Sequence, residues 1–98
     1  MNKFLFFQNE ANDCNVYPLA RLKSVEGESD ALKFTFDTES GVDIISVTLA
    51  SSSDELAAMT AVAQLINKHP HSDGIIVIAD DVASVYAHSS MTAVGAAG

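Results

Sequence analysis

The stretch SSDELAAMTAVAQLINKH, residues 52–69, predicts a helix that is apolar around most of its circumference. At about 100° per residue, one face collects Leu56, Met59, Val62, Ala63 and Ile66. A second apolar surface beside it carries Ala58, Ala61 and Leu65, and the polar arc is left to Thr60, Gln64, Asn67 and Lys68. Because one sheet buries only one face of a helix, we expect the second surface to meet another copy of the chain.

Residues that favour helix starts and stops flank this stretch. Ser52 and Glu55 match a capping box, in which the two side chains satisfy free backbone N–H groups at the helix start. Pro70 cannot continue a helix, so the helix is expected to end before it.

The segments before the helix predict strands joined by turns. Phe4 to Phe7 are apolar at consecutive positions, which indicates a strand covered on both faces. Asn9 to Asn15 is polar and predicts a loop. Pro18 lacks a backbone N–H and places the next strand at a sheet edge or at a bulge.

A hairpin is predicted next, between residues 32 and 49. Leu32, Phe34 and Phe36 alternate with polar residues, which is typical of a strand with one buried face. In the following strand, Val42 to Leu49, Ile44 breaks the alternation and indicates either a bulge or a contact between subunits.

Two strands and a tail are predicted after the helix. Ile75 to Ile78 is apolar on both faces, and Val82 to His88 is expected to return as a strand. The small residues of Met91 to Gly98 fit a strand that pairs within the subunit or adds to a neighbour's sheet edge. The order of elements predicts one α+β domain over residues 1–98, an antiparallel meander with one helix packed across it and further strands after the helix.

Composition limits the classes of function. In a chain of 98 residues, 48% hydrophobic residues exceed what a small monomer readily buries. The net charge is -8 and the five basic residues form no cluster, which argues against binding to nucleic acid. Cys14 is the sole cysteine, so the chain has no internal disulfide and suits a reducing interior.

The location of the protein is predicted from its apolar runs. The run from Phe4 to Phe7 is shorter than the core of a secretory signal, which needs about 7 to 15 residues. No run approaches the roughly 20 apolar residues that cross a bilayer. We therefore expect a cytoplasmic protein that leaves the cell only as part of a particle such as a virion.

The most metal-like group is formed by His69, His71 and Asp73, which Asp80, Asp81 and His88 could complete. A histidine-proline pair at a helix end, followed by Asp-Gly, is also ordinary turn chemistry, and we favour that interpretation. Neither a metal nor another cofactor is expected.

Other chemical candidates are weaker. Cys14 with a histidine could pair a nucleophile with a base, but no nucleophile motif surrounds it. Asp80 and Asp81 with Glu39 and Asp43 could bind calcium, although adjacent aspartates at a strand end favour a solvated turn. The isolated glycines form no phosphate loop. We expect no catalytic residues and no enzyme activity.

Segments spread over most of the chain resemble small virion proteins of tailed bacteriophages, marine ones in particular. They are Tyr17-Pro18-Leu19, Leu22 to Val25, Leu32 to Phe36, Val47 to Leu49, Leu56 to Ile66 and Asp73 to Asp80. The resemblance is one of layout and transfers no functional residues. It implies a symmetric building block, such as a capsid decoration or accessory protein, which could also contact other virion proteins.

The function expected from these observations is a structural protein that forms a homo-oligomer, a trimer or a dimer. Its contacts are predicted at Ala58, Ala61, Leu65, Ile44 and Val94. One alternative is a small ligand-binding or regulatory domain with a pocket between helix and sheet. Another is a metal-dependent enzyme that uses His69, His71 and Asp73.

Overall fold

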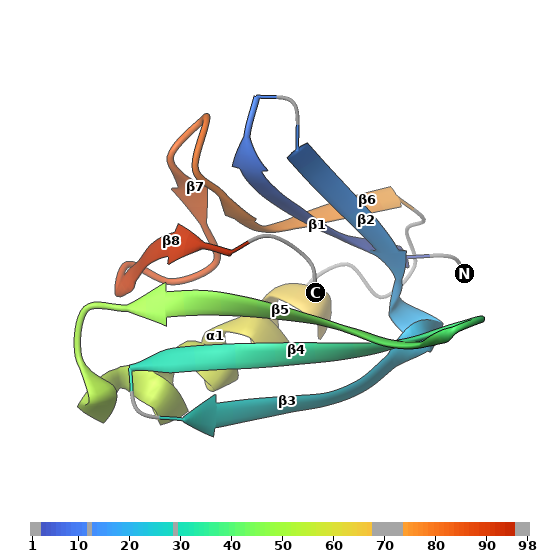
Figure 1. Cartoon of the computed structure of the whole chain (residues 1–98). Helices are drawn as coiled ribbons and strands as arrows, with labels where there is room; N and C mark the ends of the chain where they lie inside the picture. Colours follow the sequence, from blue (N-terminus) through green and yellow to red (C-terminus); the bar gives the residue numbers. More distant parts are fainter. Residues whose placement is uncertain (1–2, 12, 29, 68–73, 96–98) are drawn as a thin grey trace.

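A computed structural model describes residues 3–11, 13–28, 30–67 and 74–95 of the chain. The protein is an α+β fold of two four-stranded sheets and one α-helix, as the sequence predicts for its class. Sheet A has the strand order β2-β1-β6-β7, and sheet B has the order β3-β4-β5-β8. Figure 1 shows the strands of sheet A crossing above those of sheet B, with α1 behind sheet B.

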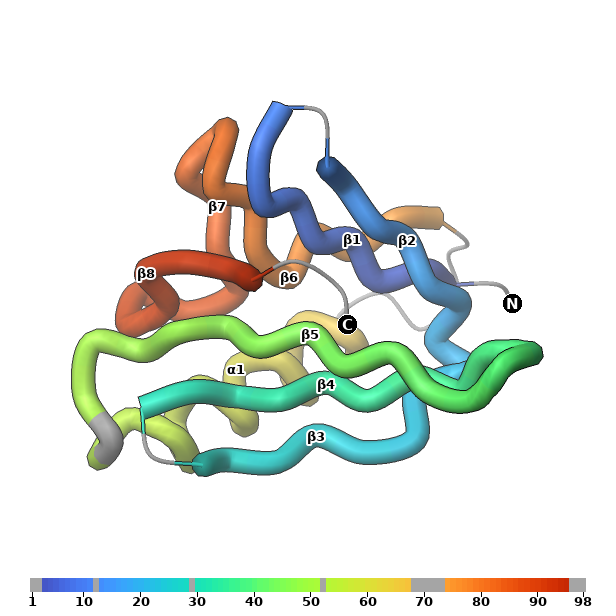
Figure 2. Tube along the Cα trace, in the orientation of Figure 1, coloured from blue at the N-terminus to red at the C-terminus, as the bar shows by residue number. Residues whose placement is uncertain are grey.

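The bounds of the elements follow chain order. Sheet A is built from β1 Lys3–Glu10, β2 Asp13–Pro18, β6 Gly74–Asp80 and β7 Val85–Tyr86. Sheet B is built from β3 Leu22–Glu28, β4 Ala31–Thr38, β5 Gly41–Leu49 and β8 Met91–Val94. The helix α1 spans Glu55–Asn67, and short 3-10 turns lie at Leu19–Arg21 and Ser52–Asp54. Figure 2 shows how the first of these turns carries the chain from β2 into β3, and so from sheet A to sheet B.

Sheet A contains a parallel pair that the sequence analysis did not anticipate. β1 and β6 run parallel, with Leu5 opposite Ile76 and Phe6 opposite Val77. Such a pair needs a long crossover, and here the connection contains sheet B's meander and α1. Both strands were recognised from runs that are apolar at consecutive positions, a pattern common in parallel sheets.

The predicted hairpin of sheet B is confirmed. Leu32, Phe34 and Phe36 on β4 are fully buried, as their alternation predicts. Ile44 pairs with Thr35 in an unbroken ladder, so the expected bulge at Ile44 is absent. Its apolar side chain lies on the solvent side of sheet B because the alternation continues through it.

The part of the tail that is described pairs within its own subunit. β8 is antiparallel to β5, with Val94 opposite Val47 and Ala93 opposite Thr48. The backbone N–H of Gly95 extends this pairing by donating to Ser46 O at 2.8 Å. The small side chains allow the strand to lie close to β5.

Two predicted boundaries in sheet A are wrong. β2 begins at Asp13, within the expected loop, because its pairing with β1 continues to Glu10 opposite Asp13. The predicted strand from Val82 to His88 is only two residues long, Val85–Tyr86. Asp80 explains the shortening, because its carboxylate accepts the N–H groups of Val82 and Ala83 and folds them into a turn.

The N-terminal cap lies one residue earlier than the capping box predicts, and the first turn is a 3-10 turn, so α1 itself begins at Glu55. The Ser51 side chain accepts the N–H of Ser53, so Ser51 caps the 3-10 turn that leads into α1. The buried face of the helix is rotated from the predicted one, although Val62 is buried and Met59 and Ile66 pack against the core as predicted. Ala58 and Val62 are buried, whereas Leu56 is 76% exposed and Ala63 is exposed too.

Part of the wide apolar surface of α1 is covered because the helix touches both sheets. It packs against β3 and β4 of sheet B and also against β6 of sheet A. Lys3 Nζ donates to the carbonyl of Ile66 at 2.8 Å and fastens the end of the helix to β1. At its start, the side chain of Glu55 fills the space beside Gly27 on β3, where no Cβ stands in its way. The subunit therefore covers Ala58 by itself, whereas Leu65 packs only partly against the core.

Aromatic rings from the two sheets meet in one core. Phe7 on β1 packs edge-on against Phe34 and Phe36 of β4, with ring centroids 5.1 and 5.9 Å apart. Tyr17 on β2 stacks on Phe36 at 4.2 Å.

In the described part of the chain, no helix has the length and apolarity to span a membrane.

Candidate functional site

One face of sheet A carries apolar side chains that do not pack into the core. Register places Phe4 between Pro18 and Ile75, and Phe6 between Val16 and Val77. Paired residues of neighbouring strands point to the same side, so these side chains form two rows across β2, β1 and β6. We call the surface formed by Phe4, Phe6, Val16, Pro18, Ile75 and Val77 the outer face of sheet A.

The outer face of sheet A is apolar and uncharged. Ile75 is 61% exposed and Val16 is 42% exposed, while Phe4, Phe6 and Val77 are half-buried among their neighbours. The next row is polar, with Gln8 between Cys14 and the charged Asp80. Cys14 is exposed. Isolated apolar residues are common on surfaces, whereas a continuous apolar patch indicates a contact site.

A groove of about 300 Å³ adjoins this face along β6. It is lined by Leu65 of α1, by Ile75, Ile76 and Val77 of β6, and by Val85, Tyr86 and Ala87. Successive residues of a strand point to opposite faces of the sheet. A groove that touches three consecutive residues of β6 must therefore run along the edge of that strand.

The edge of β6 at this groove is open. β7 pairs only with Ala79 and Asp80, and the N–H of Ala87 donates to Ile78 O. Within the ranges that the structure describes, no strand pairs with Gly74–Val77 on the side away from β1. Such an edge presents backbone donors and acceptors to whatever lies beside it.

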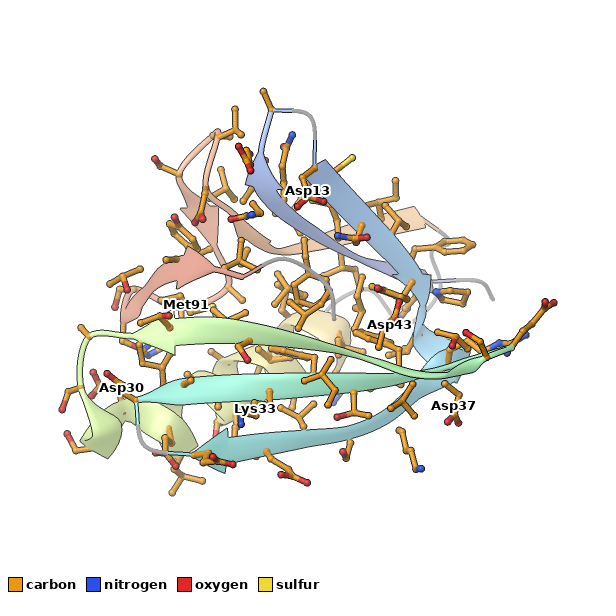
Figure 3. All side chains as sticks on the ribbon, viewed as in Figure 1. Asp13, Asp30, Lys33, Asp37, Asp43 and Met91 are labelled. Atoms are coloured by element: carbon orange, nitrogen blue, oxygen red, sulfur yellow. The ribbon has the colours of Figure 1, made fainter. Side chains whose placement is uncertain are left out.

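Tyr17 joins the two sheets on one side of the molecule. Its hydroxyl donates to Asp43 Oδ2 on β5 at 2.8 Å, beside the end of β2 (Figure 3). Burial, the hydrogen bond to Asp43 and the negative charges of Asp43 and Asp13 raise the pKa of Tyr17 to about 12. The ionised phenolate is disfavoured here, so the Tyr17 hydroxyl keeps its proton and stabilises the fold as a hydrogen-bond donor to Asp43.

Tyr86 and Asp81 form the corresponding joint on the other side. The Tyr86 hydroxyl donates to Asp81 Oδ1 at 2.7 Å, and Asp81 Oδ2 accepts the N–H of Val94 on β8 at 3.1 Å. The hydrogen bond to Asp81, burial and the charges of Asp81 and Asp80 raise the pKa of Tyr86 to about 12. Asp81 thereby ties the end of sheet A to sheet B.

The predicted contact residues are divided between the interior and the surface. Ala58 and Val94 are buried within the subunit, at 0% and 3% exposure, and cannot contact a second copy without unfolding. Ala61 is half-buried on α1. Leu65 packs partly against the core and lines the groove, while Ile44 is 39% exposed on sheet B.

The predicted metal ligands His69, His71 and Asp73 lie outside the described residues. Within the described ranges, no group of three or more histidine, cysteine or acidic side chains is placed to hold a metal ion. The candidate calcium ligands have other partners. Asp43 binds Tyr17, Asp80 caps a turn and Asp81 binds Tyr86.

His88 is engaged locally. Its Nδ1 accepts the N–H of Ser90 at 3.1 Å and lies 2.7 Å from Ser90 Oγ. The Ser90 carbonyl in turn accepts the N–H of Ala50 at 2.7 Å. His88 therefore shapes the turn into β8.

Comparison of the chain with protein-family models, with curated proteins and with solved structures finds no match. The resemblance to phage virion proteins therefore rests on the layout of the sequence. The sequence analysis missed the outer face of sheet A as a site, although it singled out both runs that build it. The available signal was that Phe4 to Phe7 and Ile75 to Ile78 each offer two apolar faces to cover.

Proposed function

We propose that this chain is a non-enzymatic structural protein whose copies assemble by packing the outer faces of sheet A against each other. One observation carries the proposal: three neighbouring strands present rows of uncharged apolar side chains that are exposed or half-buried and do not pack into the core. The contact residues thus differ from those expected on the helix. The surplus apolar surface lies on sheet A instead.

A second copy is the partner that suits this face best. Sheets pack well on sheets, and a two-fold axis places an identical face opposite each residue row. The net charge of -8 would draw a basic partner to acidic parts of the surface, whereas the outer face of sheet A has no charge to offer it. Copies with the same net charge repel each other, so association should strengthen as salt is added.

Sedimentation velocity of Phe6→Lys tests the proposal. The new charge lies in the middle of the contact, so the native mass should fall relative to the unchanged protein at micromolar concentration. Thr35→Lys on β4 is the matched control, because Thr35 lies on the solvent side of sheet B between Ser24 and Ile44. An unchanged protein that sediments as a monomer in both low and high salt would refute the proposal.

Cys14 provides an independent probe without any substitution. It is exposed in the subunit and lies next to the apolar rows. Its alkylation should slow as the protein concentration rises and the faces become covered. In the Phe6→Lys variant, alkylation should be fast at every concentration.

A more specific form of this proposal is that the protein assembles into a phage particle as a decoration or accessory protein. It is supported by the layout of the sequence and by the apolar outer face of sheet A, through which copies could assemble. Co-sedimentation of the tagged protein with purified particles tests it, and exclusion from particles would limit the proposal to self-assembly.

The alternative of a small-molecule site draws less support from the groove. Its lining is apolar apart from Tyr86, whose hydroxyl is already bonded to Asp81. Pockets for small ligands usually add several convergent polar groups to an apolar wall. The groove suits apolar side chains of a protein segment better.

A further inference from the structure

We infer that the open edge of β6, at Gly74–Val77, pairs antiparallel with the same edge of a second copy and joins two A sheets into one. This inference rests on the proposed self-assembly and adds a second interface to it. Exposed strand edges accept another strand through backbone hydrogen bonds, and side-chain pockets beside them give specificity.

The groove beside this edge has an apolar lining that suits an added strand. Its walls are α1 at Leu65 on one side and the β7 segment at Val85 and Ala87 on the other. β7 ends its pairing at Ala79, so the incoming strand would continue the ladder where β7 leaves it. Among the residues that the structure describes, no charged side chain lines the groove, so apolar side chains of the partner can enter there without desolvating a charge.

The same edge of a second copy fits by symmetry. A two-fold axis perpendicular to the sheet sets a strand edge antiparallel to itself, so the donors and acceptors of one copy meet those of the other. Ile75 and Val77 belong both to the groove and to the outer face of sheet A. Edge pairing would therefore bring the outer faces of the two copies side by side in one continuous surface.

The area of the outer face explains why this second contact is needed. The two apolar rows extend about 13 Å along the strands, and three strands span about 14 Å, so the face covers about 180 Å². Stable interfaces bury about 800 Å² on each partner. Two edge-paired copies would present about 360 Å², twice the area of a single face. The expected particle is a tetramer, in which two edge-paired dimers pack face to face.

Sedimentation velocity on four proteins separates the two contacts. The unchanged chain should be a tetramer. Leu65→Asp places a charge in the groove and should leave a dimer held by the outer faces, with slow Cys14 alkylation. Phe6→Lys should leave a dimer held by the β6 edges, with fast Cys14 alkylation. The double variant should be a monomer.

The controls address folding and position. Ala63→Asp adds the same charge to an exposed position of α1 outside the groove lining and should keep the tetramer. Because Leu65 also packs partly against the core, Ala87→Lys serves as a second groove variant, and circular dichroism verifies that each variant is folded.

The outcomes distinguish this inference from the proposed function. A tetramer or dimer whose mass is unaffected by both groove variants overturns edge pairing and leaves assembly through the outer face intact. A monomeric unchanged protein overturns both. A dimer lost in both groove variants but retained in Phe6→Lys supports edge pairing and overturns packing through the outer face.

Discussion

The outer faces of the two sheets differ although their inner faces share one core. On sheet B, the row through the middle of β4 reads Glu26, Lys33 and Ser46 across three strands. On sheet A, the corresponding row reads Val16, Phe6 and Val77. Lys33 and Asp37, labelled in Figure 3, mark the polar surface of β4.

This difference separates the folding of the subunit from the self-assembly that we propose for it. Water solvates the polar rows of sheet B, so that face is complete in a single copy. The apolar rows of sheet A gain free energy when they leave water, about 25 cal/mol for each Å² buried. A face of this kind contributes most after a partner covers it.

The largest effect on stability is expected for Phe34→Ala. Phe34 is fully buried between Phe7 and the rest of the core, so its loss should lower the free energy of unfolding by about 3–5 kcal/mol. Phe6→Ala removes a phenyl ring from the outer face of sheet A and should lower the free energy of unfolding of the dilute monomer by about 1 kcal/mol. Urea denaturation measures both. Equal costs would show that the outer face of sheet A belongs to the core.

Alkaline pH tests the joints between the sheets. Tyr17 and Tyr86 each have a pKa of about 12 in the folded protein, against about 10 for tyrosine in an unfolded chain. A raised pKa means that the folded state holds the proton more tightly, so this stability is complete below pH 10 and is lost as pH rises towards 12. Thermal unfolding followed across this range should show the decline. In the double variant Tyr17→Phe/Tyr86→Phe, the melting temperature should fall less steeply with pH. An unaltered dependence of the melting temperature on pH would contradict the role of these joints.

Lys3→Met tests the link between sheet A and the helix. The charged donor on the Ile66 carbonyl is lost while the length of the side chain is kept. We expect the free energy of unfolding to fall by about 1.5 kcal/mol, the lower end of the range for a hydrogen bond to a charged group, because this bond is only partly buried. Chemical denaturation checks this, and Lys3→Arg should retain most of the stability.

The smallest effect is expected for Lys33→Met on the outer face of sheet B. Lys33 Nζ lies 3.2 Å from Glu28 Oε1, and both side chains are exposed. Exposed ion pairs contribute little because water screens them, so the change should stay within about 0.5 kcal/mol. If Lys33→Met costs as much as Lys3→Met in the same denaturation assay, the contrast between the outer surface and the inner contacts fails.

The sequence predicted the strands of sheet B better than those of sheet A. Alternation at Leu32, Phe34 and Phe36 identifies the buried face directly, because the period of a strand is two residues. The runs at Phe4 to Phe7 and Ile75 to Ile78 identify strands but give no preference between faces. The pattern therefore could not reveal which face stays uncovered, or that the two strands are parallel neighbours.

The helix, too, was predictable from the sequence as an element but not in the face that it buries. Its existence, and its end before Pro70, follow from local patterns in the sequence. Which residues it buries depends on its contacts with both sheets, and those contacts rotate Ala58 inward and Leu56 outward. When most of a helix is apolar, periodicity gives a weak indication of the buried side.

The candidate site was predictable only in outline. A surplus of apolar residues predicts assembly, and the helix pattern predicts Leu65 as a contact residue; both stay predictions. Its position beside the edge of β6 depends on residues far apart in the chain that meet in the groove. Val94, also expected at a contact, instead pairs with Val47 inside the subunit.

The sequence by itself determined the secondary elements, the α+β class and the excess of apolar side chains, because these depend on composition and on periods of two or about 3.6 residues. Only the tertiary structure decided that β1 lies between β2 and β6 and that β7 is too short to cover the edge of β6. Register between distant strands gathers Phe4, Phe6, Val16 and Ile75 on one surface, and no local pattern specifies that register.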